Sequence, residues 1–228
     1  MEDDFLGTLL TADKELCRDE PEIAANIGIQ LEHMGLQTWS VSIRRRIRDT
    51  VSKLQPKKII EVGCGIGHLS AWMLDHLSVH GQIESYDLVE QGNRFAVILT
   101  RLTDRYPQVP TRIIVGEAIN LASQTNAWKL SGMQGQEPPL MIEADLIIVN
   151  LPPEVIAENI EVLLRHLSSD GVLLTVEPIP PVGDLSSKDP SVIGFNRWME
   201  LIKSTNQSHN LAFAPLFGGS IVAWKTKN

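Results

Sequence analysis

Ten residues decide the fold of this sequence: Lys58-Ile59-Ile60-Glu61-Val62-Gly63-Cys64-Gly65-Ile66-Gly67. The β-branched run that opens the stretch predicts a buried strand, and residues 68–77 predict the helix that follows. The alternating glycines between them allow a tight turn and a close approach of a ligand to the backbone. The helix start offers free N–H groups and the positive end of its dipole. In open α/β sheets, ligands bind just beyond the C-terminal ends of the strands, which is where this turn lies.

Strands and helices alternate over the rest of the chain. We expect strands over 82–86, 112–115, 144–149 and 171–176, and helices over 92–105, 154–167 and 190–204, with a short helix from residue 117. A loop is expected over 130–143 and a final hairpin over 211–216 and 220–224. The pattern predicts an α/β fold: a Rossmann-like doubly wound sheet of seven strands, with an antiparallel C-terminal hairpin and a helical N-terminal extension.

Residues 1–40 precede this alternation and predict one or two helices. Apolar residues recur there at helical spacing: Ile23, Ile27, Leu31 and Met34. The extension is too short for a core of its own. We expect it to be a lid or a dimerisation element, which makes a homodimer one expectation, and we assign residues 41–228 to the main domain.

The composition excludes several classes of protein. The 228 residues are 43% hydrophobic and 21% charged, which is typical of a globular domain. A net charge of −8 argues against general binding of nucleic acid. No apolar run approaches the ~20 residues that span a bilayer, and Met1-Glu2-Asp3-Asp4 lacks the basic start of a signal peptide. We therefore expect a cytoplasmic protein that binds no membrane.

The charges are unevenly distributed. Residues 1–34 carry nine acids and two bases, whereas residues 41–58 carry seven bases and one acid. Ile43, Ile47, Val51 and Leu54 predict an amphipathic helix in the basic stretch. Its arginines are expected on a solvated face, with the acidic N-terminal segment as one partner. A contact with RNA phosphates is the alternative.

The glycine spacing separates two cofactor classes. The dinucleotide fingerprint is G-x-G-x-x-G, whereas this sequence has G-x-G-x-G with His68 in the next position. The motif resembles that of the class I S-adenosylmethionine-dependent methyltransferases, and the resemblance implies S-adenosyl-L-methionine as the cofactor of the domain 41–228. A nicotinamide oxidoreductase is a distant alternative.

Further residues match this family. Asp87 follows the second expected strand, where an acid accepts hydrogen bonds from ribose hydroxyls. Val115-Gly116-Glu117-Ala118 is similar to the family's G-x-A turn beside the adenine. Glu61 is expected to order the glycine loop or to face the methionine amino group. The expected cofactor-binding residues are Glu61, Gly63, Cys64, Gly65, Gly67, Asp87, Leu88, Gly116, Glu117 and Ala118.

Within the family, the chain resembles the small O-methyltransferases of the catechol and caffeoyl-CoA type. The resemblance lies in residues 171–177, in Pro181-Val182-Gly183-Asp184, in Phe195-Asn196-Arg197-Trp198 and in the ending 211–224. It implies O-methylation of a small molecule by direct in-line transfer. A hydroxyl acceptor must lose its proton, and Glu177 and Asp184 are candidates for the base by position.

The sequence departs from these enzymes at their metal site. They end the fourth strand in aspartate and the fifth in aspartate-asparagine, where this chain has Asn150, Glu177 and Pro178. Hard cations prefer several charged oxygen ligands, so we expect no metal. Asn150 and Glu177 remain the expected catalytic residues. The same departure favours an alternative, a cofactor-binding protein that has lost catalysis.

Asn150-Leu151-Pro152-Pro153 supports a third alternative. It resembles the Asn-Leu-Pro segment of tRNA guanine methyltransferases and, loosely, the N-P-P-[YF] motif of amino-methyltransferases. An RNA or amino-group methyltransferase would use the asparagine to hold the acceptor. However, Glu154 stands where the aromatic residue would be, and prolines also simply start helices.

Overall fold

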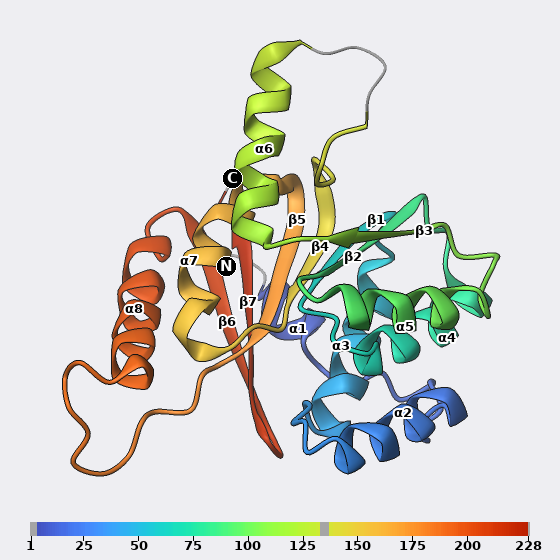
Figure 1. Cartoon of the computed structure of the whole chain (residues 1–228), viewed down its shortest axis with the longest axis horizontal. Helices are drawn as coiled ribbons and strands as arrows, with labels where there is room; N and C mark the ends of the chain where they lie inside the picture. The colour runs from blue at the N-terminus through green and yellow to red at the C-terminus, as the bar shows by residue number, and fades with distance from the viewer. Residues whose placement is uncertain (1–3, 133–136, 228) are drawn as a thin grey trace.

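A seven-stranded sheet forms the centre of the computed structural model, which describes residues 4–132 and 137–227 (Figure 1). The strand order is β3-β2-β1-β4-β5-β7-β6, and only β7 runs against the other strands. The strands are β1 Lys58–Val62, β2 Ser85–Glu90, β3 Thr111–Val115, β4 Ala144–Val149, β5 Leu167–Val176, β6 His209–Leu216 and β7 Gly219–Thr226. The predicted Rossmann-like sheet with its antiparallel hairpin is confirmed.

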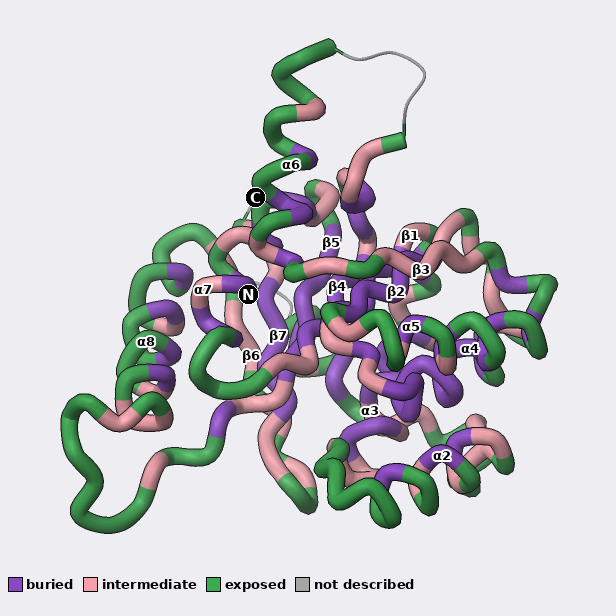
Figure 2. Tube along the Cα trace, viewed as in Figure 1, coloured by how far each residue is buried: buried purple, intermediate pink, exposed green. Residues whose placement is uncertain are grey.

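Helices cover both faces of the sheet. Successive strand residues point to opposite faces, so Ile59 packs in one apolar core and Ile60 in the other. One face carries α3 Val41–Leu54, α4 His68–His80 and α5 Asn93–Thr103. The other carries α6 Ala118–Ser131, α7 Pro153–Leu163 and α8 Pro190–Thr205, and a short 3₁₀ helix, Leu164–His166, leads into β5. Figure 2 shows the central strands, such as β1 and β4, as buried, whereas the edge strands β3 and β6 are more exposed.

The N-terminal segment packs into the first of these cores. Its two helices are α1 Phe5–Leu9, which contacts β6 and β7, and α2 Glu22–His33, which lies on α4. Ile27 and Leu31 are buried as their spacing predicts, whereas Met34 lies just past the end of α2 and is 49% exposed. The extension therefore shares the core of the main domain.

The second strand lies three or four residues later than the sequence analysis placed it. It was expected over 82–86, but β2 runs from Ser85 to Glu90, because Tyr86 to Glu90 are all buried between β1 and β3. Consequently Asp87 lies inside the strand, and the acid at its end is Glu90. The expected loop over 130–143 is correct for 137–143, whereas residues 130–131 belong to the helix Ala118–Ser131 and residues 133–136 lie outside the described part of the chain.

No helix in the described ranges is long and apolar enough to cross a membrane.

Candidate functional site

Gly63 and Gly65 both adopt a left-handed backbone conformation, but they do different things. Their φ angles are +80° and +56°. A Cβ on Gly63 would lie 2.0 Å from the carbonyl oxygen of Asn150, so this glycine lets the ends of β1 and β4 approach. A Cβ on Gly65 would meet nothing within 4 Å. Gly65 therefore borders open space in which a ligand can approach the backbone.

Glu90 places a carboxylate directly beneath this loop. Its Oε2 accepts a hydrogen bond of 2.7 Å from the Gly65 N–H, and its Oε1 accepts one of 2.9 Å from the Gly92 N–H. An acid at the C-terminal end of the second strand is where ribose hydroxyls are bound in doubly wound folds. Sequence reasoning missed Glu90 because the strand was placed too early; an acid directly before Gln91-Gly92 was the available signal.

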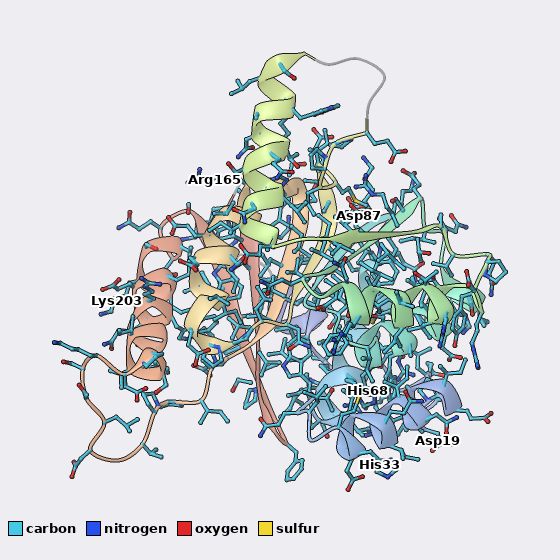
Figure 3. The ribbon with its side chains drawn as sticks, in the orientation of Figure 1. Asp19, His33, His68, Asp87, Arg165 and Lys203 are labelled. Atoms are coloured by element: carbon cyan, nitrogen blue, oxygen red, sulfur yellow. The ribbon has the colours of Figure 1, made fainter. Side chains whose placement is uncertain are left out.

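The structure corrects the positions expected for Asp87 and Leu88. Asp87 is fully buried and forms an ion pair of 2.6 Å with Arg112, and it also accepts a 3.2 Å hydrogen bond from the Met141 N–H. In Figure 3 it lies well away from His68, the residue that follows the glycine loop. Leu88 is fully buried in the core. Both residues lie buried within β2 rather than at its end, which is not the position from which they were expected to contact the cofactor.

Glu61 is buried below the glycine loop. Its carboxylate accepts hydrogen bonds from the Ser70 hydroxyl at 2.9 Å and from the Tyr86 hydroxyl. Burial raises its pKa to about 7, although these two hydrogen bonds act in the opposite direction. Glu61 thus joins β1 to α4 and β2 on either side of the loop and does not line the open space, and its expected role of ordering the loop stays a prediction.

Glu61 predicts a pH dependence of stability. Its pKa of about 7 in the folded protein exceeds the ordinary value of 4.5, so ionisation disfavours folding. The free energy of unfolding should fall by about 3 kcal/mol as the pH rises from 4.5 to above 7. Urea denaturation at several pH values should show this slope reduced in Glu61→Gln. Parallel profiles for the two proteins would contradict the assignment.

A cavity of about 570 Å³ opens beside the glycine loop. Gly63, Cys64, Gly65, Asn150 and Glu177 all line it, so the structure brings three expected cofactor residues and both expected catalytic residues together. Asn150 follows β4 and Glu177 follows the neighbouring β5. The N-terminal segment, the start of α7 and the β6–β7 turn complete the walls, with Leu31, residues 36–40, residues 151–153, Ile156, residues 178–179, Gly218 and Gly219.

The polar side chains of this cavity are few. They are Gln37, Thr38, Ser40, His68, Asn150 and Glu177. Burial and the Arg44 guanidinium lower the pKa of His68 against the opposing effect of Glu20, so the imidazole is neutral at pH 7. Glu177 is then the charged side chain of the lining. Among the described residues, the side chains of Asn150 and Glu177 have no hydrogen-bond partner, which leaves both available to a ligand.

Glu20 ties the N-terminal segment to this site. Its Oε1 accepts hydrogen bonds from Arg44 Nη2 at 2.7 Å and from Trp72 Nε1 at 3.2 Å, and lies 3.2 Å from His68 Nε2. The other ring nitrogen of His68 lies 3.1 Å from the Thr38 hydroxyl, which belongs to the cavity wall. Residues 36–40 are thus held over the cavity by contacts that sequence reasoning missed.

The basic helix is corrected as well. Helix α3 ends at Leu54, and its arginines do not form a solvated face: Arg44 and Arg48 are buried. Arg44 pairs with Glu20, and Arg48 binds Asp49 at 2.7 Å and the Cys17 carbonyl at 2.8 Å. The partners of these arginines come mostly from the N-terminal segment, as the uneven charge had suggested for one of them, so these guanidinium groups are not available to RNA.

The remaining expected residues lie outside the cavity lining. Gly67 caps α4, where a Cβ would lie 2.6 Å from Leu102 Cδ2. The Gly116 N–H donates to the Glu90 carbonyl, which places the turn 116–118 beside the end of β2. Glu117 accepts a 2.9 Å hydrogen bond from Gln91. Asp184 is exposed in the loop after β5 and does not line the cavity, so Glu177 remains the better placed base.

The positions expected for a metal meet at the cavity wall. Asn150, Glu177 and Pro178 all line it, and among them Glu177 alone carries a carboxylate. No group of three or more His, Cys, Asp or Glu side chains in the described part of the chain is arranged to hold an ion. Independence from metal stays a prediction.

Several solved structures share this architecture. The O-methyltransferase TomG from Streptomyces achromogenes, involved in tomaymycin synthesis and solved with S-adenosylmethionine, is 17% identical, with 93% of each chain covered and a TM-score of 0.68. An O-methyltransferase from Bacillus cereus, in complex with S-adenosylhomocysteine, is 17% identical over 93% of this chain and 94% of its own, with a TM-score of 0.69. The chain has the fold of these methyltransferases.

The Podospora anserina methyltransferase PaMTH1, solved with S-adenosylhomocysteine, matches with 15% identity over 91% of this chain and 89% of its own, at a TM-score of 0.63. No protein-family model matches the sequence, and no curated protein matches it either. The resemblance drawn from the glycine loop is therefore confirmed at the level of the fold. The reaction has to be argued from the site.

Proposed function

We propose that the protein transfers a methyl group from S-adenosylmethionine to a hydroxyl group of a small molecule. The observation that carries this proposal is the shared cavity of the glycine loop, Asn150 and Glu177, in a fold that also occurs in O-methyltransferases solved with the cofactor or its product. The cavity volume of about 570 Å³ lies in the range of small-molecule binding sites.

The residues at the glycine loop fit the cofactor. Gly65 leaves a space that a Cβ would begin to fill, and the Glu90 carboxylate, which holds the Gly65 N–H, would accept the ribose hydroxyls through its remaining lone pairs. Gly116 and Glu117, beside the end of β2, would border the adenine. When bound, S-adenosylmethionine supplies an activated methyl group, so the protein has mainly to position the acceptor.

Glu177 and Asn150 would handle the acceptor. Their backbone N–H groups donate 2.8 Å hydrogen bonds to Ser220 and Val62 respectively, which fixes both residues at the ends of their strands. Glu177 would accept the proton of the acceptor hydroxyl, and Asn150 would orient that hydroxyl through its amide. The apolar wall formed by Trp39, Pro152 and Ile156 would exclude water from the acceptor.

The lining also indicates the chemical class of the acceptor. No Lys or Arg belongs to the cavity lining within the described ranges, and its charged group is a carboxylate. An acceptor with a carboxylate or phosphate would be repelled there and would lack a partner. A neutral phenol with an apolar body suits the site best.

The cytoplasmic location and the homodimer stay predictions.

Two measurements test the proposal. Calorimetry should show S-adenosylhomocysteine binding with micromolar affinity, on the order of −8 kcal/mol, and no tight binding of NAD. A radiolabelled methyl group should then be transferred to neutral phenols and not to phenols that carry a carboxylate or a phosphate. The transfer should continue in the presence of EDTA. Tight binding of NAD alone would overturn the cofactor. Binding of S-adenosylhomocysteine without transfer to any phenol would favour the alternative of a protein that has lost catalysis.

Glu177→Gln should lower the rate of methyl transfer by about 10²-fold, the lower end for general base catalysis, because a phenol is already moderately acidic. The affinity for S-adenosylhomocysteine should change little. Moreover, the loss should shrink as the pH approaches the phenol's own pKa of about 10, where the acceptor ionises unaided. Comparing the pH profiles of both proteins, with Asp184→Asn as the control, measures this. Equal losses at every pH would leave Glu177 without a role as a base.

Glu90→Gln and Asp87→Asn should separate binding from stability. An amide at position 90 accepts fewer hydrogen bonds and leaves the Gly65 or the Gly92 N–H unpaired, so we expect about tenfold weaker binding of S-adenosylhomocysteine together with a loss of about 1–3 kcal/mol of stability. Asp87→Asn breaks the buried pair with Arg112 and should cost about 1–3 kcal/mol of stability, with cofactor affinity retained. Calorimetry and thermal denaturation of both variants give the comparison. The reverse pattern would restore Asp87 as the ribose ligand.

A further inference from the structure

A second, smaller cavity of about 140 Å³ lies outside the methyltransferase site. Its walls come from the N-terminal segment, from the first turns of α3 and from the turn between β6 and β7. Figure 1 shows the β6–β7 hairpin reaching down toward the N-terminal part of the chain, where the Ser40 hydroxyl, just before α3, bonds the Phe217 carbonyl. The residues that matter are Arg18, Ser42, Arg45, Arg46 and Asp49.

Hydrogen-bond donors converge on this cavity without acceptors to match. Arg45 Nε is buried and has no hydrogen-bond partner among the described residues. The rest of the Arg45 guanidinium forms no ion pair within that part of the chain, and neither does the guanidinium of Arg18, which is exposed to solvent at the mouth of the cavity. Arg46 uses one nitrogen, Nη1, on the Leu10 carbonyl at 2.6 Å. An unpartnered buried donor is costly, so the arrangement favours an acceptor that enters from outside.

The acidic residue of the cavity does not supply that acceptor. Asp49 Oδ1 accepts hydrogen bonds from Arg48 Nε at 3.0 Å and from Arg48 Nη2 at 2.7 Å. Its Oδ2 accepts one of 3.1 Å from the Asp13 N–H. The carboxylate is thereby neutralised and occupied on both oxygens. The cavity keeps an excess of positive charge, and the N-terminal end of α3 adds to it.

We propose that this cavity binds a small tetrahedral oxyanion, either inorganic phosphate or the phosphate group of a larger molecule. Guanidinium groups match phosphate oxygens through paired N–H donors, and the Ser42 hydroxyl adds a further donor. The volume of about 140 Å³ is well below that of a typical site for a whole drug-sized ligand, which favours a single compact anion.

The anion would act on the same turn that borders the methyltransferase cavity. Phe217 lines the small cavity, and its carbonyl accepts a 2.7 Å hydrogen bond from the Ser40 hydroxyl. Ser40, Gly218 and Gly219 line the large one. An anion held by Arg18 and Arg45 would therefore join the N-terminal segment to α3 beside the hydrogen bond between Ser40 and Phe217. Binding to the folded protein alone would also stabilise it.

The test is a titration of the full chain with inorganic phosphate at constant ionic strength, with potassium chloride as the balancing salt. We expect a saturable rise in melting temperature and saturable broadening of the ³¹P resonance. Arg45→Ala should weaken binding at least tenfold, and Arg45→Lys should lose most of that affinity because it lacks the planar donor pair. Arg101→Ala, an exposed arginine on α5 with the same change of charge, should bind as the wild type does.

The other possible outcomes also test whether the small cavity binds phosphate. No saturable effect on the wild type, or equal losses in Arg45→Ala and Arg101→Ala, would overturn the proposal. If Arg45→Ala is unstable without phosphate, Ser42→Ala gives the same comparison with a smaller expected loss. A phosphomonoester that binds tenfold more tightly than inorganic phosphate would identify the phosphate of a larger molecule, and equal affinities would identify the free anion. Binding of bulk tRNA without binding of phosphate would overturn the proposal in favour of a nucleic-acid surface.

Discussion

Gly65→Leu is expected to yield a folded protein that binds S-adenosylhomocysteine more than about 10³-fold more weakly than the wild type, which moves a micromolar affinity beyond the millimolar range. The space in front of Gly65 is open, since a Cβ there would meet no described atom within 4 Å, so the first carbon of a leucine side chain meets no clash and the φ of +56° adds backbone strain alone. It would, however, occupy the space assigned to the cofactor. The expected loss is therefore mainly in binding, and stability should fall only by the cost of the backbone strain.

Two other glycines make this experiment decisive. Gly132 has a φ of +61°, close to the +56° of Gly65, and a Cβ added there would likewise meet nothing within 4 Å. Gly132→Leu thus carries the same backbone strain, about 1–2 kcal/mol, at a site remote from the cavity. It should lower the melting temperature as much as Gly65→Leu does and leave binding intact. Gly63→Ala should instead fail to fold normally, because its Cβ would lie 2.0 Å from the Asn150 carbonyl.

Calorimetry with S-adenosylhomocysteine and thermal denaturation of the three variants give the answer. Wild-type affinity in Gly65→Leu would mean that the cofactor lies elsewhere, and the proposed function would lose its central observation. Equal losses of affinity in Gly65→Leu and Gly132→Leu would attribute the effect to strain in the backbone.

The sequence predicted the central strands well because their signal is local. β1 and β4 have the expected bounds, since each is an apolar β-branched run that ends at glycine or at a polar residue. β2 contains acids at both Asp87 and Glu90, and the pattern alone did not show which acid ends the strand. What places Asp87 inside the strand is its ion pair with Arg112, which lies 25 residues further along the chain.

The same reasoning explains the N-terminal contacts. Helical spacing located α3 and its apolar side, but Arg44, Arg46 and Arg48 bind a glutamate and backbone carbonyls from the segment before α3. A carbonyl leaves no trace in a pattern of residue types. An amphipathic helix with many arginines is ordinarily solvated, and here a second segment covers it. That difference changes the expected effect of a mutation in the helix from small to large.

Arg44→Glu should lower the free energy of unfolding by about 3–5 kcal/mol, the range for a buried ion pair that loses one partner. The Arg44 side chain is 4% exposed and Glu20 is 24% exposed, so the new carboxylate would face an existing one with little water between them. Arg44 also donates to the Trp39 carbonyl, and Trp39 belongs to the cavity wall. The substitution should therefore loosen the cover of the site as well.

Urea denaturation measures this loss, with Arg101→Glu as a control that makes the same change of charge on an exposed position of α5. That control should change stability by no more than about 1 kcal/mol. Adding Glu20→Gln to Arg44→Glu should recover part of the loss, because it removes the repulsion and leaves only the missing donor. A small effect of Arg44→Glu, equal to that of Arg101→Glu, would mean that the helix is solvated after all. RNA phosphates would then again be available as partners for its arginines.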